Sequence, residues 1–276
     1  MALLPVPQPY DFSLSMERFR AFGLDLAFVW RDGCLRRAVA GREVRIEAAP
    51  GGVRVEPFDA AVAAEVSHLL GLPFELEPFR AFAAAEPTLA RLVAALPGFR
   101  PPLLPDPFEM LVTSITAQQV SLHAARAIRN RLLERYGDPV GRAYAFPPRE
   151  RLASLRDGDL VALGFSRRKA EYVLGLARAE LDLRALAALP DGEVAARLTE
   201  VRGLGRWTAD WFLARHLARP TAWPAGDLAL RKAVSAFYGE GRELTTEEVR
   251  AMGDRFAPFQ NLTAHTLLTG LRTVGG

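Results

Sequence analysis

The sequence predicts an α+β fold in which a small antiparallel-sheet domain precedes an all-α domain. Between residues 24 and 58, short runs of β-forming residues alternate with turn signals, which is typical of a meander. Beyond about residue 78, apolar residues recur at helical spacing instead. We therefore divide the chain into domains at residues 1–77 and 78–276, and we expect about the first 18 residues to pack on the second domain.

The first domain is predicted to hold four strands and one helix. Asp32-Gly33 and Pro50-Gly51-Gly52 are turn signals between strands, and Asp59 is a good N-cap for a helix that ends near Leu70. We expect the strands at residues 24–30, 34–39, 43–48 and 53–58.

The second domain is predicted to be helical throughout, without further strands. A stiff connector at Phe99–Pro107 interrupts it, because its prolines remove donors and fix φ. We expect helices at residues 88–96, 108–136, 166–179, 191–201, 206–217, 227–237, 246–256 and 261–271.

Composition excludes several classes of protein. The 35 basic and 32 acidic residues nearly balance, so a nucleic-acid surface would need local clustering of charge. Cys34 is the only cysteine, which excludes an intramolecular disulfide, a four-thiolate zinc site and a four-cysteine iron–sulfur cluster. No apolar run reaches the ~20 residues of a membrane span, and Met1–Tyr10 lacks the pattern of a signal peptide. We expect a soluble, cytoplasmic protein without a membrane partner.

A very short turn with glycines two residues apart joins two of the predicted helices. Gly203 and Gly205 permit a close approach that a Cβ would block, and the next helix begins at once. Its free N–H groups and positive dipole end suit a phosphate, to which Thr208 adds a hydroxyl. On the turn alone, a tight helix connection without function explains the pattern equally well.

Asp227 follows a Gly/Pro-containing loop and precedes the helical run LALRKAVSAF. An aspartate in this position is a strong N-cap, typically worth about 1 kcal/mol. A capping carboxylate can also face a ligand, so a structural and a functional role are compatible. Trp207 and Trp211, at i and i+4, fall on one helix face and are candidates for an aromatic wall or for ordinary core packing.

Taken together, VRGLGRWTADWF and WPAGDLALRK resemble the helix-hairpin-helix superfamily of DNA glycosylases, and within it the bacterial 3-methyladenine DNA glycosylase II family (AlkA-like). The likeness extends to PYDFSLSMERF, SITAQQVS and FAPFQNLTAHTLL, and so covers nearly the whole chain. The resemblance implies a first domain like the TATA-box-binding protein and a helical bundle whose cleft holds a flipped base.

The same resemblance implies the roles of individual residues. Asp227 falls on the catalytic position, and a base pocket and a DNA-contacting set surround it. Backbone carbonyls are expected to hold a monovalent cation, Na⁺ or K⁺, and no other cofactor is required. The base pocket is expected to contain Trp207, Trp211 and Phe19, the DNA contacts Gln119, Arg202, Gly203, Gly205 and Thr208, and the cation site the carbonyls of Thr199, Val201 and Leu204.

Several positions depart from the family pattern. Gln119 replaces a leucine that fills the gap left by the flipped base, and Arg202 replaces the usual hairpin proline. Leu268 and Leu228 stand where a pocket tryptophan and a tyrosine are found, which predicts a more open pocket. Trp207 occupies the position of the Schiff-base lysine of bifunctional relatives, and an indole cannot form an imine.

The expected activity is that of a monomeric, monofunctional glycosylase without AP lyase activity, which starts base excision repair. It would flip alkylated bases such as 3-methyladenine and 7-methylguanine out of double-stranded DNA and excise them. Three alternatives remain open at this stage: a non-catalytic DNA-binding module, a relative that excises oxidised or mismatched bases, and a helical scaffold in which Asp227 is only a cap.

Overall fold

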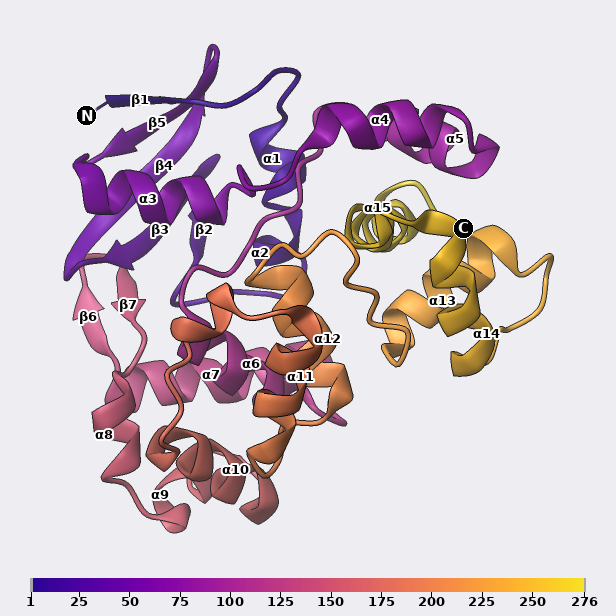
Figure 1. The fold of residues 1–276 in the computed structure, drawn as a ribbon. Helices are drawn as coiled ribbons and strands as arrows, with labels where there is room; N and C mark the ends of the chain where they lie inside the picture. The colour runs from indigo at the N-terminus through magenta and orange to yellow at the C-terminus, as the bar shows by residue number, and fades with distance from the viewer. Residues whose placement is uncertain (1, 276) are drawn as a thin grey trace.

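The computed structural model describes residues 2–275, in which an antiparallel sheet is followed by many helices (Figure 1). The α+β fold class predicted from the sequence is confirmed. The sheet has the order β1-β5-β4-β3-β2 with every pairing antiparallel. Its strands are β1 (Ala2–Pro5), β2 (Val29–Arg31), β3 (Cys34–Val39), β4 (Arg42–Ala49) and β5 (Gly52–Glu56).

The predicted meander is present, but its two ends differ from the prediction. The edge strand β1 was not predicted, because four residues that include a proline carry little strand signal. Its backbone lies so close to β5 that a Cβ on Gly52 would stand 2.1 Å from the Leu4 carbonyl oxygen. At the other edge, β2 covers only the end of the predicted strand 24–30, because Asn130 binds the backbone of Leu24 and Leu26 and holds this segment as a loop.

One helix covers the sheet, and short helices precede it. In α3 (Ala60–Leu69), the side chain of Asp59 accepts the Val62 N–H at 2.9 Å, which confirms the predicted cap. The helix lies against a face of the sheet and buries Val62, Val66 and Leu69 there (Figure 1). Between β1 and β2, the chain forms the short helices α1 (Phe12–Ser15) and α2 (Glu17–Arg20).

The rest of the chain is mainly helical, and none of the helices in residues 2–275 is long and apolar enough to cross a membrane. The α-helices are α4 (Leu76–Ala84), α5 (Pro87–Ala95), α6 (Pro107–Ala117), α7 (Leu122–Tyr136), α8 (Arg149–Ala153), α9 (Asp157–Val161), α10 (Arg167–Arg178), α11 (Asp191–Glu200), α12 (Arg206–Arg215), α13 (Leu228–Tyr238), α14 (Thr246–Met252) and α15 (Gln260–Thr273), with 3-10 turns η1 (Ala185–Ala188) and η2 (Gly253–Phe256).

The helical part differs from the predictions in several details, and α4, α8 and α9 were not predicted. The single helix expected at 108–136 is two helices, α6 and α7, separated by a turn in which Gln119 has φ +54°. The expectation of no further strands is wrong, because β6 (Asp138–Val140) and β7 (Ala143–Ala145) form a hairpin. Residues 77 and 78, where the domains were divided, lie within α4, and the division itself stays a prediction.

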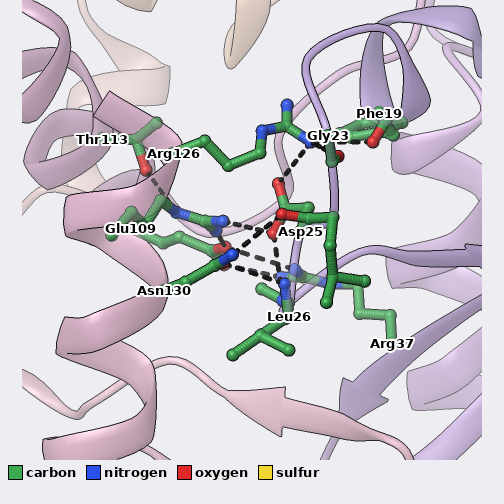
Figure 2. Close-up of polar contacts among 12 residues, drawn as sticks. Phe19, Gly23, Asp25, Leu26, Arg37, Glu109, Thr113, Arg126 and Asn130 are labelled. Atoms are coloured by element: carbon green, nitrogen blue, oxygen red, sulfur yellow. Dashed lines mark hydrogen bonds and ion pairs between the residues drawn. The ribbon is translucent and has the colours of Figure 1, made fainter. Parts of the chain in front are cut away.

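A buried ionic network joins the sheet region to α6 and α7 (Figure 2). Glu109 of α6 accepts hydrogen bonds from Arg37 of β3 and Arg129 of α7, and Arg129 also pairs with Asp25 at 2.5 Å. These four residues are at most 6 % exposed. Since removing one partner of a buried ion pair leaves an uncompensated charge, the network resists separation of the sheet from the two helices.

Arg126 of α7 extends this network to the loop that follows α2. Its guanidinium donates to the carbonyls of Phe19 at 2.8 Å, Gly23 at 3.2 Å and Arg18 at 3.4 Å, and it lies 3.4 Å from Asp25 (Figure 2). Arg126 therefore fixes the backbone of α2 relative to α7.

We expect Glu109→Gln to lower the free energy of unfolding by about 3–5 kcal/mol, since two buried guanidinium groups lose a shared carboxylate. Glu47→Gln is the matched control, because Glu47 also pairs with two arginines, Arg45 and Arg54, in exposed contacts on the sheet. Chemical denaturation should show little change for the control. Equal losses in the two variants would contradict a special role for the buried network.

Candidate active site

Asp227 is the N-cap of α13, as the sequence predicts. Its Oδ1 accepts the Leu230 N–H at 2.9 Å, and its own N–H donates to the Pro224 carbonyl at 2.9 Å. The side chain is half-buried between two exposed neighbours, Gly226 and Leu228. The cap therefore fixes the carboxylate at a point where one side of it remains accessible.

Two indole groups hold the second carboxylate oxygen. Trp207 Nε1 donates to Asp227 Oδ2 at 2.8 Å, and Trp211 Nε1 donates to the same atom at 3.0 Å. The i, i+4 spacing places both side chains on one face of α12, which makes this double contact possible. Trp211 is 2 % exposed and belongs to the core as well, whereas Trp207 is half-buried. The Leu230 N–H and the two indole N–H groups thus give the carboxylate three hydrogen-bond donors.

The two glycines of the turn between α11 and α12 have different surroundings. Gly203 has φ +97°, and a Cβ there would lie 2.1 Å from the ring of Tyr172 on α10. A Cβ on Gly205 would meet nothing within 4 Å, so the surface above this residue is open. Within residues 2–275, the N–H groups of Gly205, Arg206 and Trp207 have no backbone acceptor, as is usual at a helix N-terminus. The open glycine and these free donors form a potential anion site.

A second loop is bound to this turn by a residue that the sequence did not single out. Gln118, the C-cap of α6, donates from Nε2 to the Gly203 carbonyl at 3.0 Å. The next residue, Gln119, is exposed at the tip of the α6–α7 turn, and Val120 and Leu122 beside it are 40 % and 48 % exposed. Gln118 thus fixes the position of the Gln119 tip relative to the glycine turn.

Two of the predicted site residues are buried. Phe19 is 4 % exposed and stacks on Phe28 with 4.4 Å between ring centroids. Thr208 is 1 % exposed, and its hydroxyl is enclosed without a hydrogen-bond partner. The structure therefore does not bring the Thr208 hydroxyl to the surface of the turn.

The remaining predicted residues lie around the turn and α13. Arg202 is exposed and forms a 3.3 Å ion pair with Glu171 of α10. Leu228 is 56 % exposed beside Asp227, whereas Leu268 is buried in α15. The carbonyls of Thr199 and Leu204 receive no backbone N–H among residues 2–275, and the Val201 carbonyl accepts the Leu204 N–H at 3.0 Å.

Arg215 is a site residue that the sequence analysis missed. Its guanidinium carbon lies 3.4 Å from the centre of the Trp211 ring, and His265 of α15 meets the same ring edge-on at 6.0 Å. Burial lowers the pKa of Arg215 to about 10, an effect that the nearby Asp227 charge opposes. The recurrence of Trp207, Trp211 and Arg215 at intervals of four was the available signal, since such spacing places all three on one helix face.

Two cavities of the molecule lie away from this carboxylate. One of about 130 Å³ lies among α4, α5 and α15, and one of about 540 Å³ lies between the start of α6 and α8. Neither is lined by Asp227, Trp207 or Trp211. The candidate site is thus defined by its hydrogen bonds and by the two surface loops beside it, rather than by the size of a cavity.

Comparison with known proteins places this geometry in a family. Residues 112–258 match the HhH-GPD superfamily base excision DNA repair proteins, a segment that contains the α6–α7 turn, the glycine turn and Asp227. A DNA-3-methyladenine glycosylase of Bacillus subtilis is 33 % identical over 63 % of this chain and 60 % of its own length. DNA-3-methyladenine glycosylase 2 of Escherichia coli is 29 % identical over 92 % of this chain and 91 % of its own length.

The fold agrees with these sequence matches. The 3-methyladenine DNA-glycosylase structure from Archaeoglobus fulgidus covers the whole of both chains with a TM-score of 0.91 and 28 % identity. The chain spans between about half and three fifths of the length of several curated relatives that it matches. On the matched segment, which is more than half of its residues, the chain belongs to the HhH-GPD superfamily of base excision DNA repair proteins.

Proposed function

We propose that this protein is a monofunctional DNA glycosylase that flips alkylated bases, of the 3-methyladenine and 7-methylguanine type, out of duplex DNA and excises them. The observation that carries the proposal is the Asp227 carboxylate held by two indole N–H groups and one backbone N–H. The names of the relatives, which describe 3-methyladenine glycosylases, support the same substrate class.

The chemistry needs a fixed negative charge more than it needs a strong acid. Alkylation at N3 or N7 makes the purine cationic, so breaking the C1′–N bond releases a neutral base with the bonding electron pair. The sugar is left as an oxocarbenium-like cation, which a preorganised carboxylate stabilises. Water then adds its oxygen to C1′ and gives up a proton, and we propose that Asp227 directs that water. The N–H donors keep the carboxylate in position without a cost of reorganisation during the reaction.

The glycine turn is the proposed binding site for the DNA backbone. The free N–H groups at the start of α12 would bind a phosphate, and the open surface above Gly205 would allow its close approach. A Na⁺ or K⁺ ion bound by the carbonyls of Thr199, Val201 and Leu204 would add positive charge beside the same phosphate, and the carbonyls of Thr199 and Leu204 receive no backbone N–H among residues 2–275. No other cofactor is needed for this role.

The exposed Gln119 tip is the proposed wedge that fills the space left by the flipped base. A glutamine can both occupy the space and form hydrogen bonds to the unpaired partner base. Arg202 lies at the glycine turn and can exchange its exposed Glu171 partner for a phosphate, because such surface pairs are weak. We further propose that the protein acts as a cytoplasmic monomer.

The proposal of monofunctional chemistry rests on Trp207. An indole cannot form the imine through which a lysine cleaves the strand. In this protein the Trp207 nitrogen instead donates to Asp227, so the side chain has a defined role in orienting the carboxylate. The product should therefore be an intact strand with an abasic site.

The two glycines of the turn provide a matched pair of variants. Gly205→Ala should leave stability unchanged and weaken binding to an abasic-analogue duplex on the order of tenfold, because the methyl group interferes with a charge-assisted contact. Gly203→Ala should lower stability by more than about 1 kcal/mol through its positive φ and the Tyr172 ring. Thermal melting and fluorescence anisotropy measure the two effects. Unchanged DNA binding by Gly205→Ala would exclude the turn as the phosphate site.

Asp227→Asn should reduce the release of 3-methyladenine and 7-methylguanine from duplex DNA by at least about a hundredfold, since the charge that stabilises the sugar cation is lost. Asparagine remains a good N-cap, so the fold should persist. Asp59→Asn is the control, because Asp59 caps α3 through the same contact away from the site. Base release is measured by chromatography, and strand cleavage is scored on the same samples without added alkali.

Each outcome of this assay bears on a different part of the proposal. Wild-type rates in Asp227→Asn would show that another group performs the chemistry. Salt-sensitive DNA binding without any base release would indicate a non-catalytic binding module. Cleaved strands from the wild-type protein in the absence of alkali would disprove the monofunctional chemistry.

A further inference from the structure

The first turn of α10 has a charge pattern that opposes its own helix dipole. Arg167, Arg168 and Lys169 follow the N-cap Ser166, and this turn contains no acidic residue. Because the positive end of a helix dipole lies at the N-terminus, cations are unfavourable there and carboxylates are favourable. The helices α8 and α9, which pack on α10, follow the favourable pattern and carry acidic residues in their first turns. Helix stability therefore does not explain the three cations of α10.

These cations have no acidic partner among residues 2–275. Arg167 and Arg168 are exposed, and neither guanidinium forms an ion pair or a hydrogen bond within that range. Lys169 is 8 % exposed, and its Nζ donates to a carbonyl oxygen, that of Thr116, at 2.8 Å. The first turn of α10 thus combines two free guanidinium groups with a buried ammonium group that no carboxylate neutralises.

The same turn is attached to both loops that we propose to contact DNA. The bond from Lys169 to Thr116 holds it to the end of α6, two residues before Gln118. Gln118 in turn binds the Gly203 carbonyl of the glycine turn. One turn further along α10, the ring of Tyr172 lies directly against the Gly203 backbone. The start of α10 therefore lies beside the α6–α7 turn and the glycine turn.

Helical spacing places both free arginines on the side of α10 that meets the glycine turn. Residues four apart lie on one face of a helix. Arg168 lies four residues before Tyr172, which packs on the glycine turn. Arg167 lies four residues before Glu171, which pairs with Arg202 of that turn at 3.3 Å. Each arginine is thus about one helical turn, or about 5.4 Å of axial rise, from a residue in contact with the glycine turn.

We propose that Arg167 and Arg168 form a second phosphate-binding surface, which holds duplex DNA through phosphates other than the one bound at the glycine turn. The inference rests on the proposed glycosylase function and extends its DNA-binding surface. A duplex fits this surface because its backbone presents a regular row of negative charges. The planar fork of a guanidinium also matches the geometry of a phosphate. The surface continues the proposed phosphate site, since α10 packs on the glycine turn.

Such a surface would act on damaged and undamaged DNA alike. Phosphate contacts fix the position of a protein on a duplex but carry no information about the bases. Arg167 and Arg168 should therefore contribute the same factor to the affinity for either kind of DNA. They would keep the protein on an intact duplex while the exposed Gln119 tip reaches successive base pairs.

The test measures how the affinity of Arg167→Gln/Arg168→Gln for DNA depends on salt. Fluorescence anisotropy with an undamaged duplex and an abasic-analogue duplex gives the slope of log K against log salt concentration. Two lost phosphate contacts should reduce the magnitude of this slope by about 2. The affinity at about 0.1 M salt should fall at least about tenfold, by the same factor for both duplexes. Glutamine is a good helix former and removes an unfavourable charge, so the melting temperature should stay the same or rise.

Arg91→Gln/Arg135→Gln is the control, because it removes the same charge from exposed arginines elsewhere. Arg91 lies on α5, far from α10 (Figure 1), and Arg135 lies at the end of α7 away from Gln119. This control should keep the wild-type slope, and so should Arg167→Lys/Arg168→Lys, which conserves the charge.

An unchanged slope in Arg167→Gln/Arg168→Gln, or an equal reduction in the control, would overturn the inference and leave the two arginines as solvated surface residues. Absence of salt-dependent DNA binding by the wild-type protein would instead reject the proposed function itself.

Discussion

The hydrogen bonds that Trp207 and Trp211 donate to Asp227 connect α12 to the start of α13. Because both indoles must reach one oxygen, α12 has to present a single face to the start of α13. That register also places the first turn of α12, with its free N–H groups, at the glycine turn. The carboxylate and the proposed phosphate site are thus two ends of one rigid arrangement.

The buried network around Glu109 extends this arrangement to the sheet region. Glu109 and Arg129 link α6 and α7 to β3 through Arg37, and Arg126 holds the backbone that carries Arg18 (Figure 2). Gln118, at the end of α6, then binds the glycine turn. The sheet region is therefore connected, through α6, to the turn that precedes Asp227 in the chain.

Local sequence signals predicted those parts of the site that depend on local geometry. Asp227 could be identified as a cap from the helix that follows it, and Gly203 from the short connection between two helices. The Gln118 bond to Gly203 could not, because it joins residues 85 positions apart. The orientation of Phe19 was also beyond local pattern, since an aromatic on a short helix can pack on either side, and here the stacking on Phe28 decides it.

The most direct test of the central claim is a crystal structure with a duplex in which the target sugar is replaced by a cationic pyrrolidine. This ring mimics the charge of the sugar in the transition state. We expect the ring nitrogen to lie within about 3.5 Å of the Asp227 carboxylate, with both indole bonds to Oδ2 retained. A pyrrolidine bound elsewhere, with Asp227 contacting only protein N–H groups, would contradict the account.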